Sequence, residues 1–154
     1  MTGTPLGLPA RPPSEVEWEE LLVRLEITPR AVRLAVEDAG GDSAVVREVL
    51  RDAIGKEIWW AELLQQLRDG RPVQMNRAIP LFPGPEPSAG ELVDGFAQLR
   101  ERNFAQVQRR GLGVWEWESP VDGGQGTLTA YQVLQGMAHG DGETLAAVRA
   151  AGRG

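Results

Sequence analysis

Residues 126–152, which read GTLTAYQVLQGMAHGDGETLAAVRAAG, decide the fold. Apolar residues recur in this stretch every three or four positions, which is the repeat of one face of an α-helix. The hydroxyl of Thr127 or Thr129 can cap the first turn, and Gly152 can end the last one. The stretch therefore predicts a closing amphipathic helix. Its inner face consists of Ala130, Leu134, Met137, Asp141, Thr144 and Val148.

Two features disturb this helix. Gly136, Gly140 and Gly142 lie in its interior, where each costs about 1 kcal/mol relative to alanine. Asp141 falls on the apolar face, where a carboxylate needs a partner.

The only histidine of the chain, His139, lies in the same helix. Glu143 follows it by one turn, which is an acceptable spacing for half of a zinc site. At about 100° per residue, however, both side chains point away from the apolar face. We therefore expect His139 at the surface rather than in a metal centre.

The composition limits the possible functions. The chain has 154 residues, of which 42% are hydrophobic and 25% charged, as in an ordinary single globular domain. Its net charge of −6 disfavours nucleic acid as a partner. The absence of cysteine excludes disulfides and thiolate chemistry. No apolar run is long enough to span a membrane, and no secretory signal is visible, so we expect a cytoplasmic protein.

The chain divides into a tail and one helical domain. Residues 1–13 hold four prolines and two glycines, and we expect them to be disordered. We expect residues 14–152 to form one domain of four helices. Its first three helices begin at the candidate caps Ser14, Ser43 and Ser88, and the closing helix begins at its threonine cap. The sequence predicts helices ending near Asp38, Asp69, Arg110 and Gly152.

Each predicted helix has an apolar face. The face of the first helix keeps one phase through Pro29, so we predict a single helix with a kink rather than two helices. The face of the second helix contains Val46, Val49, Ala53, Trp60, Leu64 and Leu67. Near its centre lies Lys56, the only lysine, with Asp52 one turn earlier. The face of the third helix contains Leu92, Phe96, Leu99, Asn103 and Val107.

The connections are of unequal length. Residues 71–87 form either a long ordered crossover or a mobile loop. Their apolar residues Ile79, Leu81 and Phe82 indicate packing across the bundle. For residues 114–126 we predict a loop that places Trp115 or Trp117 over the bundle, because a lone strand has nothing to pair with. The predicted fold is all-α, a four-helix bundle with a long crossover between helices 2 and 3.

Two segments resemble the DinB-like superfamily, the damage-inducible and bacillithiol-transferase-like bundles. Residues 45–60, VVREVLRDAIGKEIWW, are similar to the family's segment in which a histidine follows VREVLA. The closing GTLT and LQGMAHGDGETL resemble the family's ending G-x-L-T followed by H-D-x-x-H-L. The resemblance covers roughly residues 16 to 150 and implies a DinB-like four-helix bundle, often a homodimer.

The resemblance also implies where a divalent metal such as zinc or nickel is bound. The three histidine positions of the family fall on Asp52, Gly140 and Thr144. Using His139 and Glu143 instead would rotate the helix by about 100° and expose its apolar face. We therefore predict that the metal site is lost and that no metal or other cofactor is bound. In its place we expect a buried polar cluster of Asp52, Lys56 and Asp141.

Three functions remain open on this basis. The first is a non-catalytic bundle without catalytic residues, which binds a partner or a small ligand. The alternative is a metal-dependent hydrolase or thiol transferase with a non-standard metal site. The third is a self-associating module, in which the glycines of the closing helix and the tryptophans form the interface. These tryptophans are Trp18, Trp59, Trp115 and Trp117.

Overall fold

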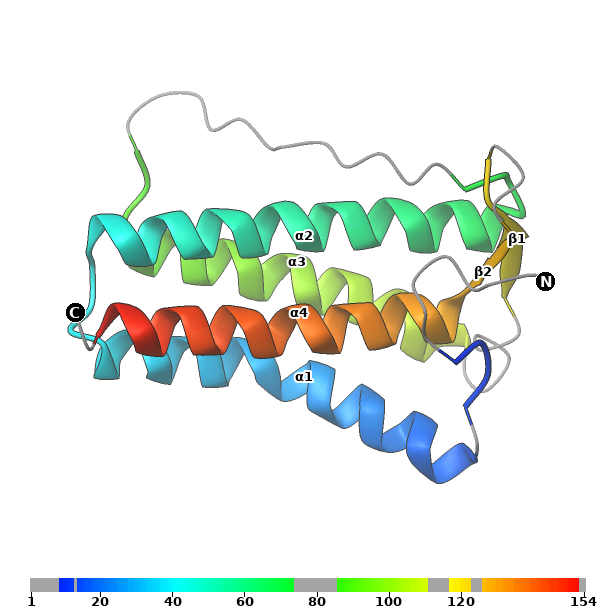
Figure 1. Ribbon diagram of the computed structural model, residues 1–154, viewed down its shortest axis with the longest axis horizontal. Helices are drawn as coiled ribbons and strands as arrows, with labels where there is room; N and C mark the ends of the chain where they lie inside the picture. Colours follow the sequence, from blue (N-terminus) through cyan, green and yellow to red (C-terminus); the bar gives the residue numbers. More distant parts are fainter. Residues whose placement is uncertain (1–8, 13, 74–85, 111–116, 123–125, 153–154) are drawn as a thin grey trace.

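The computed structural model describes residues 9–12, 14–73, 86–110, 117–122 and 126–152 (Figure 1). The described residues form four helices and one small sheet. The elements are α1 (Glu15–Asp38), α2 (Ala44–Asp69), α3 (Ala89–Arg110), β1 (Glu118–Pro120), β2 (Thr127–Thr129) and α4 (Ala130–Ala151). The predicted all-α, four-helix class is thus confirmed.

The helices begin and end where their capping residues predict. The Ser14 hydroxyl accepts the Glu17 N–H, and the Ser43 hydroxyl accepts the Val46 N–H. Thr129, rather than Thr127, caps α4 and forms a reciprocal capping box with Gln132. Gly70 ends α2 with φ 68°, a left-handed conformation that glycine adopts without strain.

The four helices form a bundle in which α1 and α4 run in one direction and α2 and α3 in the other (Figure 1). α1 packs against α3 and α4, and α2 packs against the same two helices. α1 and α2 therefore occupy opposite corners. As predicted, α1 is one helix that continues through Pro29, and it bends near its middle (Figure 1).

The loop prediction for residues 114–126 is wrong in part, because β1 is a strand. It pairs antiparallel with β2, with Ser119 opposite Leu128. The partner strand lies directly before α4, in residues that were read only as the cap of that helix. Trp117 does pack against the core, as expected. Trp115 and the crossover residues Ile79, Leu81 and Phe82 lie outside the described residues.

The tail prediction concerns residues 1–13, of which only 9–12 are described. These residues contact the start of α4. The Thr129 hydroxyl donates to the Ala10 carbonyl at 2.7 Å, and the Gln135 amide donates to the Pro9 carbonyl at 2.9 Å. This short segment is therefore held against the domain.

Among the described residues, the apolar core consists of two clusters of buried side chains. One cluster includes Leu25, Trp60, Phe104 and Met137, and the other includes Val32, Ala53, Phe96 and Val148. Each helix has residues in both clusters. In each helix, one or two buried polar residues lie between those of the first cluster and those of the second. These residues are Thr28, Glu57, Arg100, Asn103, Asp141 and Thr144. A polar layer thus crosses the bundle between two apolar halves.

Within the described residues, no helix is both long enough and apolar enough to cross a membrane.

Candidate functional site

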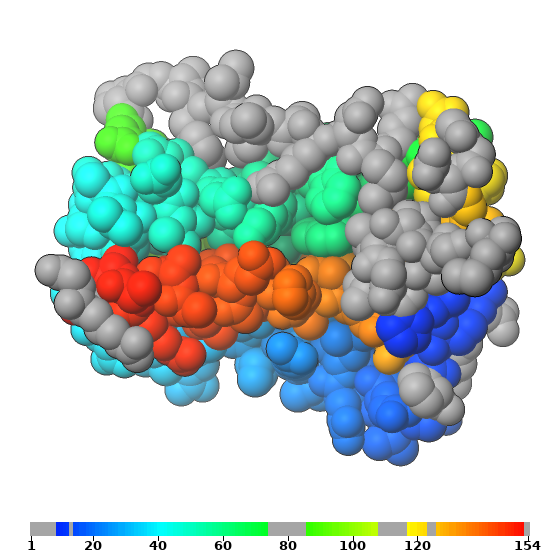
Figure 2. All heavy atoms as spheres, viewed as in Figure 1, coloured from blue at the N-terminus to red at the C-terminus, as the bar shows by residue number. Residues whose placement is uncertain are grey.

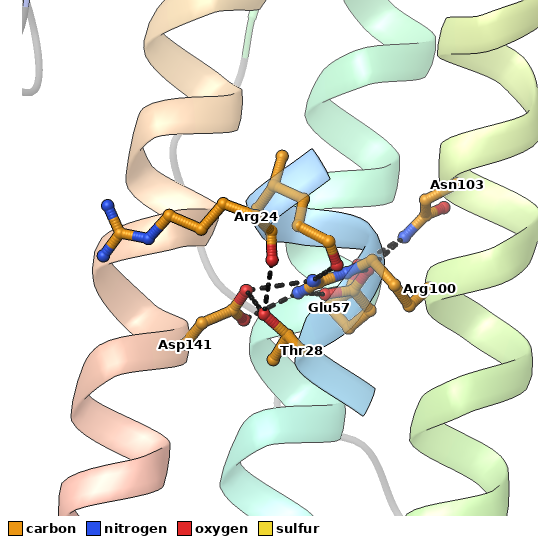
Figure 3. Close-up of polar contacts among 7 residues, drawn as sticks. Arg24, Thr28, Glu57, Arg100, Asn103 and Asp141 are labelled. Atoms are coloured by element: carbon orange, nitrogen blue, oxygen red, sulfur yellow. Dashed lines mark hydrogen bonds and ion pairs between the residues drawn. The ribbon is translucent and has the colours of Figure 1, made fainter. Parts of the chain in front are cut away.

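The polar layer is organised around the guanidinium group of Arg100 in α3 (Figure 3). Its Nε and Nη2 donate to the two carboxylate oxygens of Glu57, each at 2.9 Å. Its Nη1 and Nη2 donate to the two carboxylate oxygens of Asp141, at 2.9 and 2.7 Å. Arg100 therefore binds carboxylates from α2 and α4 bidentately, which is the strongest geometry for such a pair.

The fifth N–H of Arg100 donates to a backbone oxygen in α1. Nη1 lies 2.8 Å from the carbonyl oxygen of Leu25. In an uninterrupted helix this carbonyl would accept from the N–H of residue 29, but Pro29 has none. The proline thus leaves a free acceptor in a buried position, and Arg100 satisfies it. All five guanidinium donors are used.

The two carboxylates are also held by neutral side chains. Glu57 Oε2 accepts from the Asn103 amide at 2.9 Å, and Asp141 Oδ2 accepts from the Thr28 hydroxyl at 2.7 Å. Thr28 Oγ1 also lies 3.1 Å from the Arg24 carbonyl. A hydroxyl has a single hydrogen, and the shorter contact to the charged carboxylate is the favoured one. All four helices contribute to this layer (Figure 3).

The layer is almost completely removed from water. The side chains of Arg100, Glu57 and Asp141 are 3%, 2% and 9% exposed. Burial by itself lowers the pKa of Arg100, but the hydrogen bonds with Glu57 and Asp141 outweigh it and raise that pKa above its ordinary value. The guanidinium also lies over the Phe96 ring, 5.2 Å from its centroid. With both carboxylates ionised, the triad carries a net charge of −1.

The predicted cluster of Asp52, Lys56 and Asp141 does not form as one unit. Lys56 Nζ pairs with Asp52 at 3.1 Å along α2, with side-chain exposures of 22% and 54%. Asp141 pairs instead with Arg100. The expectation that Asp141 needs a buried partner is confirmed, but the assignment of that partner was wrong.

The error concerns two positions on the inner face of α2. Its buried face passes through Leu50 and Glu57 rather than through Val49 and Lys56. Val49 and Leu50 are neighbours in the sequence, and so are Lys56 and Glu57. The spacing of apolar residues alone therefore does not decide which member of each pair is buried. The correct face has the spacing 4-3-4-3-4-3 over Val46, Leu50, Ala53, Glu57, Trp60, Leu64 and Leu67. This regular spacing is the signal that could have identified Glu57.

Arg100 was missed for a different reason. It lies between Phe96 and Asn103 at spacings of four and three residues, in line with the predicted inner face of α3. An arginine at such a position is normally assigned to the surface. The unpartnered Asp141 on the inner face of α4 was the available hint that a buried cation had to exist.

The glycines of α4 have distinct roles. A Cβ atom at Gly136 would lie 2.4 Å from the ring of Trp60, so glycine is required for the indole to fit against α4. A Cβ atom at Gly140 would only touch the Lys56 stem at 3.7 Å, and at Gly142 it would meet open space. The ring of Trp60 therefore fills the space beside Gly136.

A small cavity adjoins the polar layer. Its lining includes Lys56, Trp60, Gly140 and Thr144, together with the ion-pair triad. Its volume is about 10 Å³, the space that about one water molecule needs. Ligand pockets are typically about 300–1,000 Å³. The cavity is therefore too small for a substrate.

The residues at the three positions implied for metal ligands do not fit a divalent metal centre. Gly140 has no side-chain donor, Thr144 offers a neutral hydroxyl, and Asp52 is paired with Lys56. The two nearby carboxylates, Glu57 and Asp141, have their oxygens engaged by Arg100, Asn103 and Thr28. Among the described residues, no three His, Asp or Glu side chains are grouped to hold a metal.

His139 lies at the surface, as predicted. Its side chain is 79% exposed, and its Nε2 is 3.5 Å from Glu143 on the same face of α4. Of the tryptophans expected in an interface, Trp18 is 2% exposed and belongs to the core. That assignment was wrong, since a buried indole cannot face a partner.

No protein-family model, curated protein or solved structure matches this chain.

Proposed function

We propose that this chain is a non-catalytic bundle of the DinB-like type, which acts by binding a partner. The observation that supports this is that the charged groups of the polar layer have their hydrogen bonds satisfied within the protein. All five donors of Arg100 and the oxygens of both carboxylates are engaged in internal hydrogen bonds. A carboxylate that acts as a general base must lie within reach of a substrate proton, and one that acts as a nucleophile must be open to the substrate. Glu57 and Asp141 meet neither condition.

The position of the layer supports the same proposal. Gly140 and Thr144, which correspond to two of the histidine positions of the resembled family, line the same cavity as Arg100 and Asp141. An ion-pair layer next to these positions ties the four helices together, as a metal would. The DinB-like resemblance and the loss of the metal centre are thus two parts of one proposal.

Elemental analysis of purified protein tests the loss of the metal. We expect no stoichiometric zinc or nickel, and no change in melting temperature with excess Zn²⁺, Ni²⁺ or EDTA. A metal present at about 100 times its Kd would stabilise the fold by about 2.7 kcal/mol, an increase of several degrees.

Two variants make this test specific. Asp52→Ala removes the carboxylate at the first implied ligand position, and His139→Ala controls for binding of metal at the exposed His139–Glu143 pair. Stoichiometric metal that is lost in Asp52→Ala but retained in His139→Ala would overturn the proposal in favour of a metal-dependent hydrolase or thiol transferase.

A further inference from the structure

Exposed apolar side chains form a line along α1. Val16, Val23, Ile27 and Leu34 are 61%, 55%, 58% and 51% exposed. Their spacing of seven, four and seven residues places them within about 20° of a common line along the helix. This line is distinct from the buried face of α1, which packs against α3 and α4. α1 forms one outer edge of the bundle (Figures 1 and 2).

Two charged residues complete this line. Glu20 and Arg30 are exposed and fall between the apolar residues. Neither forms an ion pair within the described part of this chain. They lie ten residues apart, about 15 Å along the helix, so they cannot pair with each other. We define the outer seam as Val16, Glu20, Val23, Ile27, Arg30 and Leu34.

The outer seam is complementary to its own reversed copy. If two such helices lie antiparallel and centred on residue 25, Glu20 of one faces Arg30 of the other. In the same arrangement Val16 faces Leu34, and Val23 faces Ile27. The 4-3-4-3-4 spacing is that of the a and d positions of a coiled coil, which form the contact layers between two helices. A two-fold axis generates each of these contacts twice.

A parallel arrangement lacks this complementarity. It would place Glu20 opposite Glu20 and Arg30 opposite Arg30, and like charges facing each other oppose association. The ring of Pro29 is not part of either contact, because at about 100° per residue it lies on the opposite side of α1. The charges of the seam therefore select the antiparallel orientation.

We propose that the outer seam is the contact surface of a symmetric dimer in which the α1 helices of two copies pack antiparallel. The inference rests on the proposed function, since it names the partner of the binding module as a second copy of this chain. Its tests are independent of metal, so the two proposals can fail separately.

Sedimentation velocity of charge variants tests the seam. Glu20→Arg and Arg30→Glu each place like charges in two layers, and we expect each to weaken dimerisation by about tenfold or more. The double variant Glu20→Arg/Arg30→Glu restores opposite charges and should regain the dimer. A one-to-one mixture of the two single variants should form a heterodimer.

Two controls accompany these variants. Glu62→Arg changes the charge equally at an exposed position of α2 and should leave dimerisation unchanged. Unchanged far-ultraviolet circular dichroism spectra, with cooperative melting at a protein concentration below the Kd of the dimer, show that the variants are folded. A wild-type protein that is monomeric at about 100 µM, or a dimer that Glu20→Arg and Arg30→Glu leave intact, overturns the proposal.

Disulfide trapping tests the orientation, and the chain has no cysteine of its own to interfere. Val16→Cys mixed with Leu34→Cys should form a mixed disulfide under mild oxidation. Val16→Cys alone should not, because the two copies of residue 16 would lie about 27 Å apart along an antiparallel seam. A disulfide that forms as readily in Val16→Cys alone as in the mixture would contradict the antiparallel dimer.

Discussion

Replacement of Arg100 by methionine is the most informative perturbation of the polar layer. Methionine retains much of the side-chain length and apolar volume but removes the cation and its five N–H donors. Glu57 and Asp141, with side chains 2% and 9% exposed, would then face each other without a positive charge. The variant therefore isolates the contribution of the cation from that of packing.

The expected loss is a large fraction of the stability of the domain. Breaking a buried ion pair by removal of one partner costs about 3–5 kcal/mol, because the remaining charge is left without compensation. A single domain has a total free energy of unfolding of about 5–15 kcal/mol. For a chain of this size, the loss corresponds to a decrease in melting temperature of about 6–20 °C.

Urea unfolding followed by circular dichroism measures this loss. The matched control is Arg33→Met, which breaks the exposed pair with Asp94, whose side chains are 47% and 60% exposed. We expect this control to cost less than about 1 kcal/mol. The triple variant Glu57→Gln/Arg100→Met/Asp141→Asn should recover part of the loss, because no buried charge remains.

Two results would refute the reasoning. The first is an Arg100→Met variant whose stability is within about 1 kcal/mol of the wild-type value, as for an exposed pair. The second is a triple variant that is no more stable than Arg100→Met. In either case the layer would not depend on compensation of buried charge.

The remaining predictions concern α4 and the turn before α2. Gly136→Ala should destabilise the protein by about 1–3 kcal/mol, because its Cβ would overlap the Trp60 ring, whereas Gly142→Ala should stabilise it by about 1 kcal/mol. Thermal unfolding of the two variants compares the signs directly. Hydrogen bonds from Arg47 and from the N–H of Ala89 lower the pKa of Asp42 below 3.8 in the folded state. A lowered folded pKa contributes stability above about pH 4 that is lost as the pH falls through that pKa. As the pH falls from about 5 through the pKa of Asp42, Asp42→Asn should therefore lose less stability than the wild type, and equal losses would contradict the role of this carboxylate.

The helix boundaries could be predicted from the sequence because they depend on local chemistry. A hydroxyl that accepts an N–H three residues later, as at Ser43 and Thr129, acts within a single turn. The left-handed stop at Gly70 is equally local. Such signals do not require knowledge of where the neighbouring helices lie.

The polar layer could not be predicted in the same way. Glu57 and Arg100 are 43 residues apart, and Arg100 and Asp141 are 41 apart, so their pairing depends on how the helices are arranged. Lys56 and Glu57 are neighbours at the inner face of α2, and only the packing of the other helices decides which of them is fully buried. The sheet was missed for a related reason, because β1 acquires a partner only when residues 127–129 are recognised as a strand.

Because of Pro29, one backbone carbonyl in the interior of α1 is available to a donor from another helix. In the helix interior every carbonyl normally accepts a hydrogen bond from the N–H four residues later. The backbone then offers a neighbouring side chain the same contacts after each turn of about 5.4 Å. Leu25 is the one interior position of α1 whose carbonyl is released by a proline, and Arg100 binds it. Sliding α1 by one turn would leave this oxygen buried without a donor and would bring Arg100 against a carbonyl that is already occupied. The amide hydrogen that Pro29 lacks thus fixes the axial position of α1 relative to Arg100.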